Sequence, residues 1–338
     1  MQIEKVDENG RPYIEISEGY TVRLEYEEVP EEYKEKARKE LRETPEIVEA
    51  SMKELRELLE ADEKLYVPVE HDDFLLKFLR PTKFYAKSAY ELMKRYYQFK
   101  IKYPKYCHNL LPSTGKLGFE HNIVNFQPKR DQHGRRILLL KGGGDWDPSK
   151  VSVVELFRAL QLSLEAAMLE PMTQINGCVT IFDMEGLSWT QIMQYTPSFA
   201  LMFLEWVQEC IPLRLKAVHI VNNMYIFNML FAIFKPFIGA KLRKRIHFHG
   251  KNYASLLKHI DPEFLRPRYG GTMPCEDVDG NLVASLLEKS SDEYELANTF
   301  GFVDNNNMTK PVIVPVTGEK KPGAKYVIAK DVVEQENN

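Results

Sequence analysis

The stretch IPLRLKAVHIVNNMYIFNMLFAIFKPFIGAKLRKRIHFHG, residues 211–250, contains the pattern that decides the fold. A β-rich run, AVHIVN, leads into an apolar segment from Met224 to Phe234, in which only Asn228 is not apolar, and RIHFHG is β-rich again. A cluster of four basic side chains follows the apolar segment: Lys241, Arg243, Lys244 and Arg245. Because strand, helix and strand follow one another, the stretch predicts an α/β domain with a largely parallel sheet.

The same alternation extends toward the N-terminus. The β-rich runs HNIVNF, RILLLKG and CVTIFDMEG alternate with the long apolar helical segments VSVVELFRALQLSLEAAML and TPSFALMFLEWVQECI. The segment PSTGKLGF before them is predicted to be a loop. The α/β domain is therefore expected to span residues 111–275, with helices flanking the sheet.

The remaining segments have different sequence patterns. Residues 30–110 carry a helical pattern in runs such as EIVEASMKELRELLEADEKL and SAYELMKRYYQFKIKYP, and are predicted to form a small all-helical domain. Residues 1–29 are expected to form a short extended preamble. Beyond Pro274 the chain becomes polar, and residues 276–338 are interpreted as an extension of uncertain order.

Length and composition indicate an ordinary globular protein. The chain has 338 residues, of which 44% are hydrophobic and 28% charged, enough for a sizeable core and more than one domain. As a helix of ~1.5 Å rise per residue, the apolar segment would be only ~16 Å long, too short to cross a bilayer. The N-terminus lacks an apolar signal, so we expect a cytoplasmic protein with reduced, unpaired thiols at Cys107, Cys178, Cys210 and Cys275.

The net charge of −4 conceals an uneven distribution of charge along the chain. Between Cys210 and Ile260 there are nine Lys and Arg residues and no Asp or Glu. A window without carboxylates in an acidic protein suggests a face that meets an anionic partner. A scattered, solvated set of charges is the alternative.

Catalytic motifs are absent from the sequence. GxSxG, HExxH and GxxxxGK[ST] do not occur, and GGGDWD at residues 142–147 lacks the spacing of a dinucleotide site. His247 and His249 would share one face of a strand but have no third ligand nearby, and Asp183 with Glu185 fits a turn or cap. We therefore expect no catalytic residue, no metal, no cofactor and no nucleic-acid partner.

Three predicted helices carry apolar stripes at helical spacing. Core helices produce the same spacing, but the third stripe has a moderately polar opposite face and ends at Lys235-Pro236. Such a short helix is typical of a mobile cover over an apolar cavity or of a segment in a membrane interface. The stripes are Phe157, Leu160 and Leu164; Phe199, Phe203, Trp206 and Val207; and Met224, Phe227, Phe231 and Phe234.

Several separated motifs resemble the CRAL-TRIO lipid-binding family. They are IFDMEGLSW, the stretch at residues 211–250, HIDPEFLRPRYGG and, for the end of that family's helical N-terminal domain, DDFLLKFLRPTKF. The similarity covers roughly residues 45–275 and is strongest to the branch of the alpha-tocopherol transfer protein and cellular retinaldehyde-binding protein. It implies a cytosolic carrier whose cavity is closed by a helical lid, here residues 222–245.

The resemblance also implies roles for individual residues. The lid stripe would seal the cavity in solution and enter the bilayer on docking, while basic residues meet the headgroups. Positions matching phosphoinositide-contacting residues are Lys83, Arg214, Lys216, Lys241 and Arg245. The cavity wall would comprise Phe157, Leu160, Gln161, Leu164, Cys178, Trp189, Tyr195, Phe203, Trp206, Val207, Ile211, Leu213 and Val218.

The wall departs from that of the tocopherol carrier. Leu160 and Leu164 stand where the carrier has serine, and Trp189, Tyr195 and Trp206 add aromatic bulk. The departures disfavour tocopherol as the cargo and leave a retinoid, a carotenoid, a sterol-like molecule or a lipid chain open.

The expected function is a cytoplasmic carrier that binds one small hydrophobic lipid and exchanges it at phosphoinositide-containing membranes. It would visit endosomal, Golgi or plasma membranes transiently. The alternative is a lipid-sensing trafficking or signalling adaptor that uses the acidic preamble or the tail to recruit a protein partner. An enzyme acting inside the cavity would lack a paired nucleophile or base.

Overall fold

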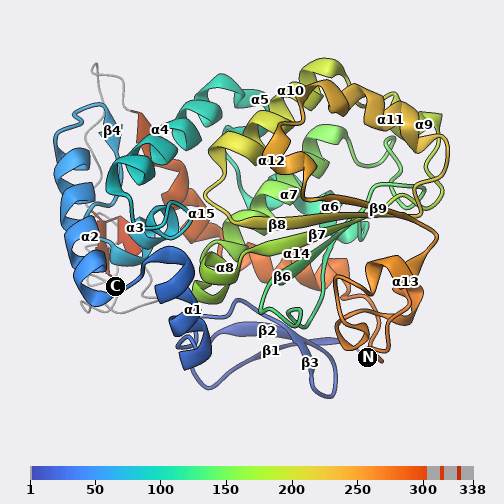
Figure 1. Ribbon diagram of the computed structural model, residues 1–338, viewed down its shortest axis with the longest axis horizontal. Coiled ribbons are helices and arrows are strands. Elements are labelled where there is room, and N and C mark those ends of the chain that lie inside the picture. The colour runs from blue at the N-terminus through green and yellow to red at the C-terminus, as the bar shows by residue number, and fades with distance from the viewer. Residues whose placement is uncertain (1, 303–312, 316–325, 329–338) are drawn as a thin grey trace, which may run out of the picture.

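The computed structural model describes residues 2–302, 313–315 and 326–328 of the chain (Figure 1). A five-stranded sheet with the order β5-β6-β7-β8-β9 lies at its centre. Strand β5 runs antiparallel to β6, and the other neighbours are parallel, as the alternating sequence pattern predicts. The strands are β5 (Val124–Phe126), β6 (Arg136–Lys141), β7 (Cys178–Asp183), β8 (Leu215–Val221) and β9 (Ile246–Gly250).

Strands β6 to β9 lie in chain order, and this order decides where the helices go. Parallel crossovers are right-handed in ~98% of cases, so successive crossovers that advance in one direction place their helices on one face of the sheet. Figure 1 shows α7, α10 and α11 together on one side of the sheet. The crossover elements are α7 (Val153–Ala167), α8 (Pro171–Asn176), α9 (Trp189–Ile192), α10 (Pro197–Glu205), the π-helical turn η1 (Trp206–Cys210), α11 (Phe227–Phe234), the 3-10 turn η2 (Lys235–Phe237) and α12 (Ala240–Arg243).

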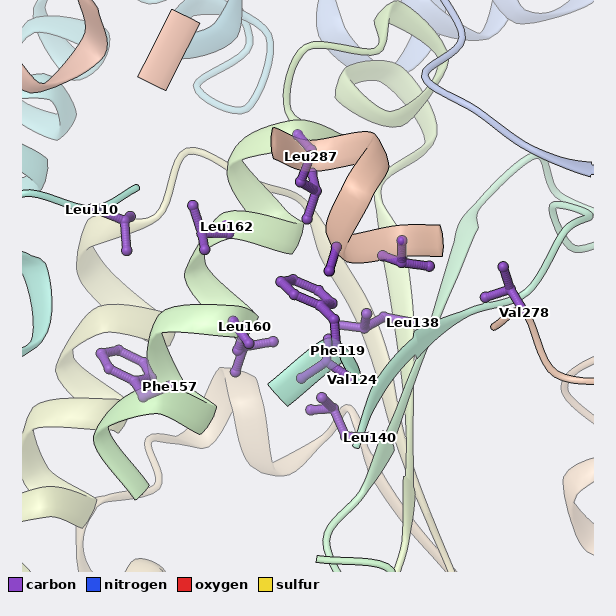
Figure 2. Close-up of a cluster of buried hydrophobic side chains, with 14 of the residues drawn as sticks. Leu110, Phe119, Val124, Leu138, Leu140, Phe157, Leu160, Leu162, Val278 and Leu287 are labelled. Atoms are coloured by element: carbon purple, nitrogen blue, oxygen red, sulfur yellow. The ribbon is translucent and has the colours of Figure 1, made fainter. Parts of the chain in front are cut away.

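The side chains of β6 alternate between two separate cores. Ile137 and Leu139 pack with Leu256 on the face covered by α13 (Tyr253–Leu256) and the turns η3 (Pro262–Phe264) and η4 (Pro267–Tyr269). Leu138 and Leu140 belong to the core on the other face, and Figure 2 shows them on the side of α7. A strand that is apolar at successive positions thereby fills two layers.

The N-terminal helices form a core of their own around residues such as Leu55 and Phe78. These helices agree with the helical pattern predicted upstream of Tyr103. They are α1 (Glu31–Leu41), α2 (Pro45–Glu60), α3 (Asp72–Leu79), α4 (Ala86–Lys102) and α5 (Pro104–Cys107), with the short strand β4 (Leu65–Tyr66).

The two terminal segments pack into the main core instead of flanking it. An antiparallel sheet of β1 (Ile3–Val6), β2 (Pro12–Ser17) and β3 (Tyr20–Val22) forms the predicted preamble. Ile14 of β2 shares a core with Val283 and Leu287 of α14 (Gly280–Glu288). The predicted extension continues in α15 (Ser291–Asn298), in β10 (Gly301–Phe302), which pairs with β4, and in the paired strands β11 (Ile313–Pro315) and β12 (Tyr326–Ile328); its remaining residues lie outside the described part.

The segment PSTGKLGF, predicted to be a loop, forms the helix α6 (Pro112–Glu120). Its two glycines suggested a loop, but they allow α6 to lie close to α7. A Cβ atom on Gly115 would lie 2.8 Å from the backbone nitrogen of Ala159, and one on Gly118 would lie 2.6 Å from the Ala159 Cβ. The glycines therefore serve helix packing, which a single segment of sequence does not reveal.

Four histidines lie together on the sheet face opposite α7. They are His219 of β8, His247 and His249 of β9, and His259, which follows α13. His219 of β8 lies 3.0 Å from His249 of β9, measured from Nδ1 to Nε2, and the rings of His247 and His259 are 4.4 Å apart. Two further histidines thus join the predicted pair. Within the described residues, however, no group of three or more His, Cys, Asp or Glu side chains is arranged to hold a metal ion.

Burial and mutual repulsion keep His219 and His249 neutral. Burial, followed by the neighbouring histidines, lowers the pKa of His219 to about 3 and that of His249 to about 4. The unfolded chain takes up protons near pH 6.5, whereas the folded chain does not. Their contribution to stability is therefore complete above pH 6.5 and is lost as the pH falls toward the folded pKa values.

We expect the free energy of unfolding to fall between pH 7 and pH 5, with His219 alone accounting for about 2 kcal/mol of the decrease. His219→Gln should flatten this dependence by that amount. Urea unfolding measured at several pH values tests the expectation, with His108→Gln, at an exposed position, as the control. Equal pH dependence in parent and His219→Gln would contradict it.

Candidate functional site

An apolar cavity lies between the sheet and the helices α7, α10 and α11. Its space, including the mouth, amounts to about 1390 Å³. Strands contribute Leu140, Phe182 and Ile220 to its wall, and Phe157 enters from α7. Successive strand residues point to opposite faces of the sheet. The strand side chains that point away from the core around Leu256 therefore form this wall.

Aromatic rings build the helical side of the wall. Phe157 packs edge-on against Trp206, with ring centroids 4.9 Å apart, and against Phe203 at 5.9 Å. Phe234 of α11 meets Tyr195 at 5.6 Å and Phe203 at 6.1 Å, again edge to face. These contacts seat α11 on α10 and close the cavity on that side.

Helix α11 has one face toward the cavity and one toward solvent. Phe227, Leu230 and Phe231 line the cavity together with Phe234. Met224, predicted to share the inward stripe, is instead 54% exposed, because it precedes the first turn of α11. The lid therefore carries apolar side chains on both faces.

Hydrogen bonds hold both ends of the lid segment to strands. Asn222, in the left-handed region at φ 54°, donates to Asp183 Oδ1 at 2.7 Å and accepts from the Tyr253 hydroxyl at 2.9 Å. At the other end, Arg245 donates to the carbonyl of Leu215 at 2.5 Å. The residues between these two ends form the cover.

Asp183 has a structural role, as the sequence suggested for a carboxylate at a strand end. Besides Asn222, its buried carboxylate accepts hydrogen bonds from the Tyr269 hydroxyl at 2.9 Å and Arg268 at 3.2 Å. Burial and the Asp183 charge raise the pKa of Tyr269, which keeps the hydroxyl protonated as a donor. Asp183 thus joins the ends of β7 and β8 to the C-terminal turn η4.

Comparison with known proteins places this arrangement in a family. The CRAL/TRIO domain model matches residues 120–271. Clavesin-1 of Pongo abelii is 35% identical over 270 residues, which cover 78% of this chain and 75% of that protein. This chain belongs to the CRAL/TRIO domain family.

A second relative and a solved structure are also similar to this chain. Clavesin-2 of Homo sapiens is 33% identical over 265 residues, covering 77% of this chain and 79% of that protein. The relatives are clavesins and not specifically the tocopherol and retinaldehyde carriers, which corrects the predicted branch. A solved structure, "Crystal structure of Sfh5", is 13% identical, with a TM-score of 0.41 over 76% of this chain and 96% of that one.

CRAL/TRIO membership supports a lipid-binding protein of the transfer type. In the part of the chain that the structure describes, every helix is too short or too polar to span a membrane.

The structure places eleven of the thirteen predicted wall residues on the CRAL/TRIO cavity. The two exceptions have clear physical reasons. Gln161 turns toward α5, where its side chain donates to the Tyr106 carbonyl at 3.0 Å and accepts from the Cys107 thiol at 3.3 Å. Trp189 begins α9 and is 54% exposed. The wall residues are Phe157, Leu160, Leu164, Cys178, Tyr195, Phe203, Trp206, Val207, Ile211, Leu213 and Val218.

Sequence reasoning missed much of the sheet side of the wall. Leu140, Thr180, Phe182, Ile220 and Ile246 line the cavity at alternate strand positions. Because every residue of β6 is buried, its sequence does not show which side chains face the cavity and which face the core around Leu256. Phe182, Ile220 and Ile246 lie within the motifs quoted from the sequence, but those motifs do not show which strand side chains face the cavity.

The predicted basic positions meet largely at the C-terminal end of α1. Arg214 and Lys216 approach Glu40 at 2.7 and 3.5 Å. Arg245 binds the carbonyl of Leu215, which lies between Arg214 and Lys216. We call Lys36, Arg214, Lys216 and Arg245 the β8 basic cluster, because Lys36 of α1 also acts electrostatically on Glu40.

The other two predicted basic positions lie beside this cluster. Lys83 is exposed, and its carbonyl accepts from Arg42 at 3.4 Å, two residues beyond Glu40. Its backbone adopts a left-handed φ of 56°, a conformation that non-glycine residues seldom take. Lys241 is exposed on α12, four residues before Arg245.

Exposed apolar side chains accumulate on the helices over the cavity. Phe248 of β9 is 47% exposed and packs edge-on against Phe231, with ring centroids 5.1 Å apart, which joins it to the lid. Exposed apolar side chains gathered in one region are a feature of interaction sites. The residues are Trp189, Met193, Leu201, Met224, Tyr225, Met229 and Phe248.

A second cavity lies between the helical domain and α15. Its wall includes Lys77 and Lys100, which approach Glu165 at 3.6 and 3.8 Å. Ionised groups are costly to leave beside a wholly apolar molecule. The cavity under α11 is therefore the better candidate for a hydrophobic ligand.

Cys178 provides a probe of the lid because its thiol lines the cavity. Burial raises the pKa of Cys178 to about 12, and the pKa of Cys107, a buried thiol outside the wall, also rises to about 12. Both should be inert toward maleimide at neutral pH, since the thiolate reacts. Phe231→Glu should unseal the lid and increase labelling at Cys178 at least tenfold, with Cys107 unchanged.

Mass spectrometry of the labelled peptides measures both sites in one sample. Equal labelling of the two thiols would indicate general unfolding, and no labelling of either would show that α11 does not gate the cavity.

Proposed function

We propose that the protein binds one small hydrophobic lipid in the cavity under α11 and exchanges it at phosphoinositide-containing membranes. The observation that carries the proposal is an almost wholly apolar cavity roofed by a short helix, in a segment whose ends are hydrogen-bonded to β7 and β8. An apolar molecule is the ligand that suits a cavity with few polar groups. Its binding is stabilised by ~25 cal/mol for each Å² of apolar surface removed from water.

The polar groups of the wall indicate the chemistry of the cargo. Thr180 and Tyr195 bring hydroxyls to the lining. Burial raises the pKa of Tyr195, so its hydroxyl stays neutral and able to donate a hydrogen bond. A rigid apolar molecule with one or two hydroxyl or carbonyl groups, such as a tocopherol-, retinoid- or carotenoid-like lipid, satisfies this wall.

The outer surface of the lid supports the membrane part of the proposal. Met229 of the lid, with Trp189 and Met193 at α9, exposes apolar side chains that can enter a headgroup layer. Lys241 and Lys244 follow Met229 at exposed positions of the lid segment. Each basic residue near an anionic leaflet contributes on the order of 1 kcal/mol, enough in sum for reversible docking by a cytoplasmic protein at endosomal, Golgi or plasma membranes.

Docking and exchange are coupled through the lid. The same segment seals the cavity with Phe231 and Phe234 and presents apolar side chains outward. A membrane that binds the open form more tightly than the closed form shifts the population toward open. Release of cargo is therefore faster at a membrane that captures the lid.

We expect the native protein to retain one hydrophobic molecule per chain, detectable by mass spectrometry of an organic extract. Leu164→Arg should abolish loading, because it places an unpaired charge in the apolar wall. Leu201→Arg, on the exposed outer face of α10, is the matched control and should load normally. Full loading of Leu164→Arg would mean that the ligand lies elsewhere.

We also expect cargo release from the loaded protein to be faster with phosphoinositide vesicles than with neutral ones. Added salt should reduce the difference, since screening shortens exposed charge interactions to ~8 Å at physiological ionic strength. Lys241→Glu with Lys244→Glu should weaken vesicle binding several-fold. Lys53→Glu with Lys105→Glu, at exposed positions on α2 and α5, is the charge-matched control.

Stopped-flow fluorescence of a bound cargo, with vesicle binding confirmed by sedimentation, measures both effects. Identical release rates with neutral and phosphoinositide vesicles would separate docking from exchange and remove the membrane part of the proposal.

A further inference from the structure

The β8 basic cluster holds more positive than negative charge. Lys36, Arg214 and Lys216 act on one carboxylate, that of Glu40, and Arg245 is repelled by Arg214. The next carboxylate, Asp131, is engaged by Arg135 at 2.5 Å. Burial and the Arg214 charge lower the pKa values of Lys216 and Arg245, as expected where cations crowd together without enough counter-charge.

Glu40 occupies an unfavourable position on its helix. It is the residue before the last of α1, where the partial negative charge of the helix end disfavours an anion. The two residues before it, Arg38 and Lys39, have the sign that suits a helix end. The contacts that stabilise Glu40 there are therefore those with Arg214 and Lys216.

Three of the four cations have partners besides Glu40. Arg214 also donates to the carbonyl of Ile175, and Arg245 to that of Leu215. Lys36 donates to the Asn176 side chain at 2.7 Å. The side chain of Glu40 is 40% exposed, against 15% for Arg214, so the carboxylate can swing into solvent while the cluster stays in place.

We propose that Glu40 is an internal competitor for the headgroup and sets a threshold on headgroup charge. Its carboxylate occupies the position that a phosphate group would take against Arg214 and Lys216. A headgroup with one phosphate gains little by displacing it, whereas one with two or more phosphates also engages Lys36 and Arg245. The inference rests on the proposed phosphoinositide docking and names Glu40 as its specificity-determining residue.

The assignment follows from the chemistry of the groups. Arginine pairs with phosphate through two parallel hydrogen bonds, which a phosphate forms at least as well as a carboxylate. Discrimination between ligands is strengthened by an element that opposes the weaker one. Glu40 supplies that element, at the junction between the helical domain and the sheet.

The test compares the full-length chain with Glu40→Gln, which removes the charge and preserves the shape. Glu35→Gln on the same helix, where Glu35 pairs with Arg38 at 3.0 Å and Lys39 at 3.1 Å, is the charge-matched control. Binding is measured to phosphatidylcholine vesicles that contain no phosphoinositide, a monophosphate or a bisphosphate. Titration with soluble inositol bisphosphate separates recognition of the headgroup from recognition of the lipid surface.

Glu40→Gln should bind monophosphate vesicles at least tenfold more tightly than the parent, with a gain of threefold or less for the bisphosphate. Glu35→Gln should change neither by more than about twofold. Soluble inositol bisphosphate should bind the parent and compete with vesicles. Unfolding midpoints establish that both variants are folded, and Glu40→Asp, which keeps the charge on a shorter side chain, should lie between parent and Glu40→Gln.

The outcomes distinguish the inference from the proposal on which it rests. If the parent prefers phosphoinositide vesicles but Glu40→Gln behaves like Glu35→Gln, Glu40 sets no threshold and only the inference fails. If parent and variants bind all vesicles equally, phosphoinositide docking fails and the inference falls with it. Bisphosphate vesicle binding that soluble inositol bisphosphate cannot compete would show that the surface charge, not the cluster, is recognised.

Discussion

The right-handedness of parallel crossovers is the constraint on which this structure depends. Four parallel strands follow one another across the sheet, so α7, α10 and α11 must stack on the same face. The space between these three helices and the sheet is the cavity. The opposite face has no crossover helices and is closed by α13 and the turns that follow it.

The same strand order explains why the lid is attached as it is. The lid is the last crossover, between β8 and the edge strand β9, and packs on fewer neighbours than α7 does. The side chains of Asn222 and Arg245 tie its two ends to the sheet through hydrogen bonds. Between these ends, the cover is held by the apolar contacts of Phe227, Phe231 and Phe234 and by Gln208 of η1, which donates to the Phe237 carbonyl and accepts from the Gly239 backbone N–H.

Much of the fold and part of the site could be predicted from the sequence. The periodicities of β6 to β9 and of α7, α10 and α11 are strong because burial enforces them, and the helix stripes that face the cavity follow from spacing alone. What failed depended on contacts between distant segments: Gly115 and Gly118 resemble loop residues until α7 is placed against them. The position of Glu40 opposite Arg214 was equally hidden, since an acidic helix ordinarily faces solvent.

The two tethered ends of the lid determine how it can move. A segment fixed at Asn222 and Arg245 moves most easily by rotating as a hinged lid about the axis that joins these two residues. The edge of the lid farthest from this axis is the side where α11 contacts α10 through Phe234 and Phe203. Cargo would then leave along the surface of α10, past the exposed Leu201, without the sheet or α7 having to shift.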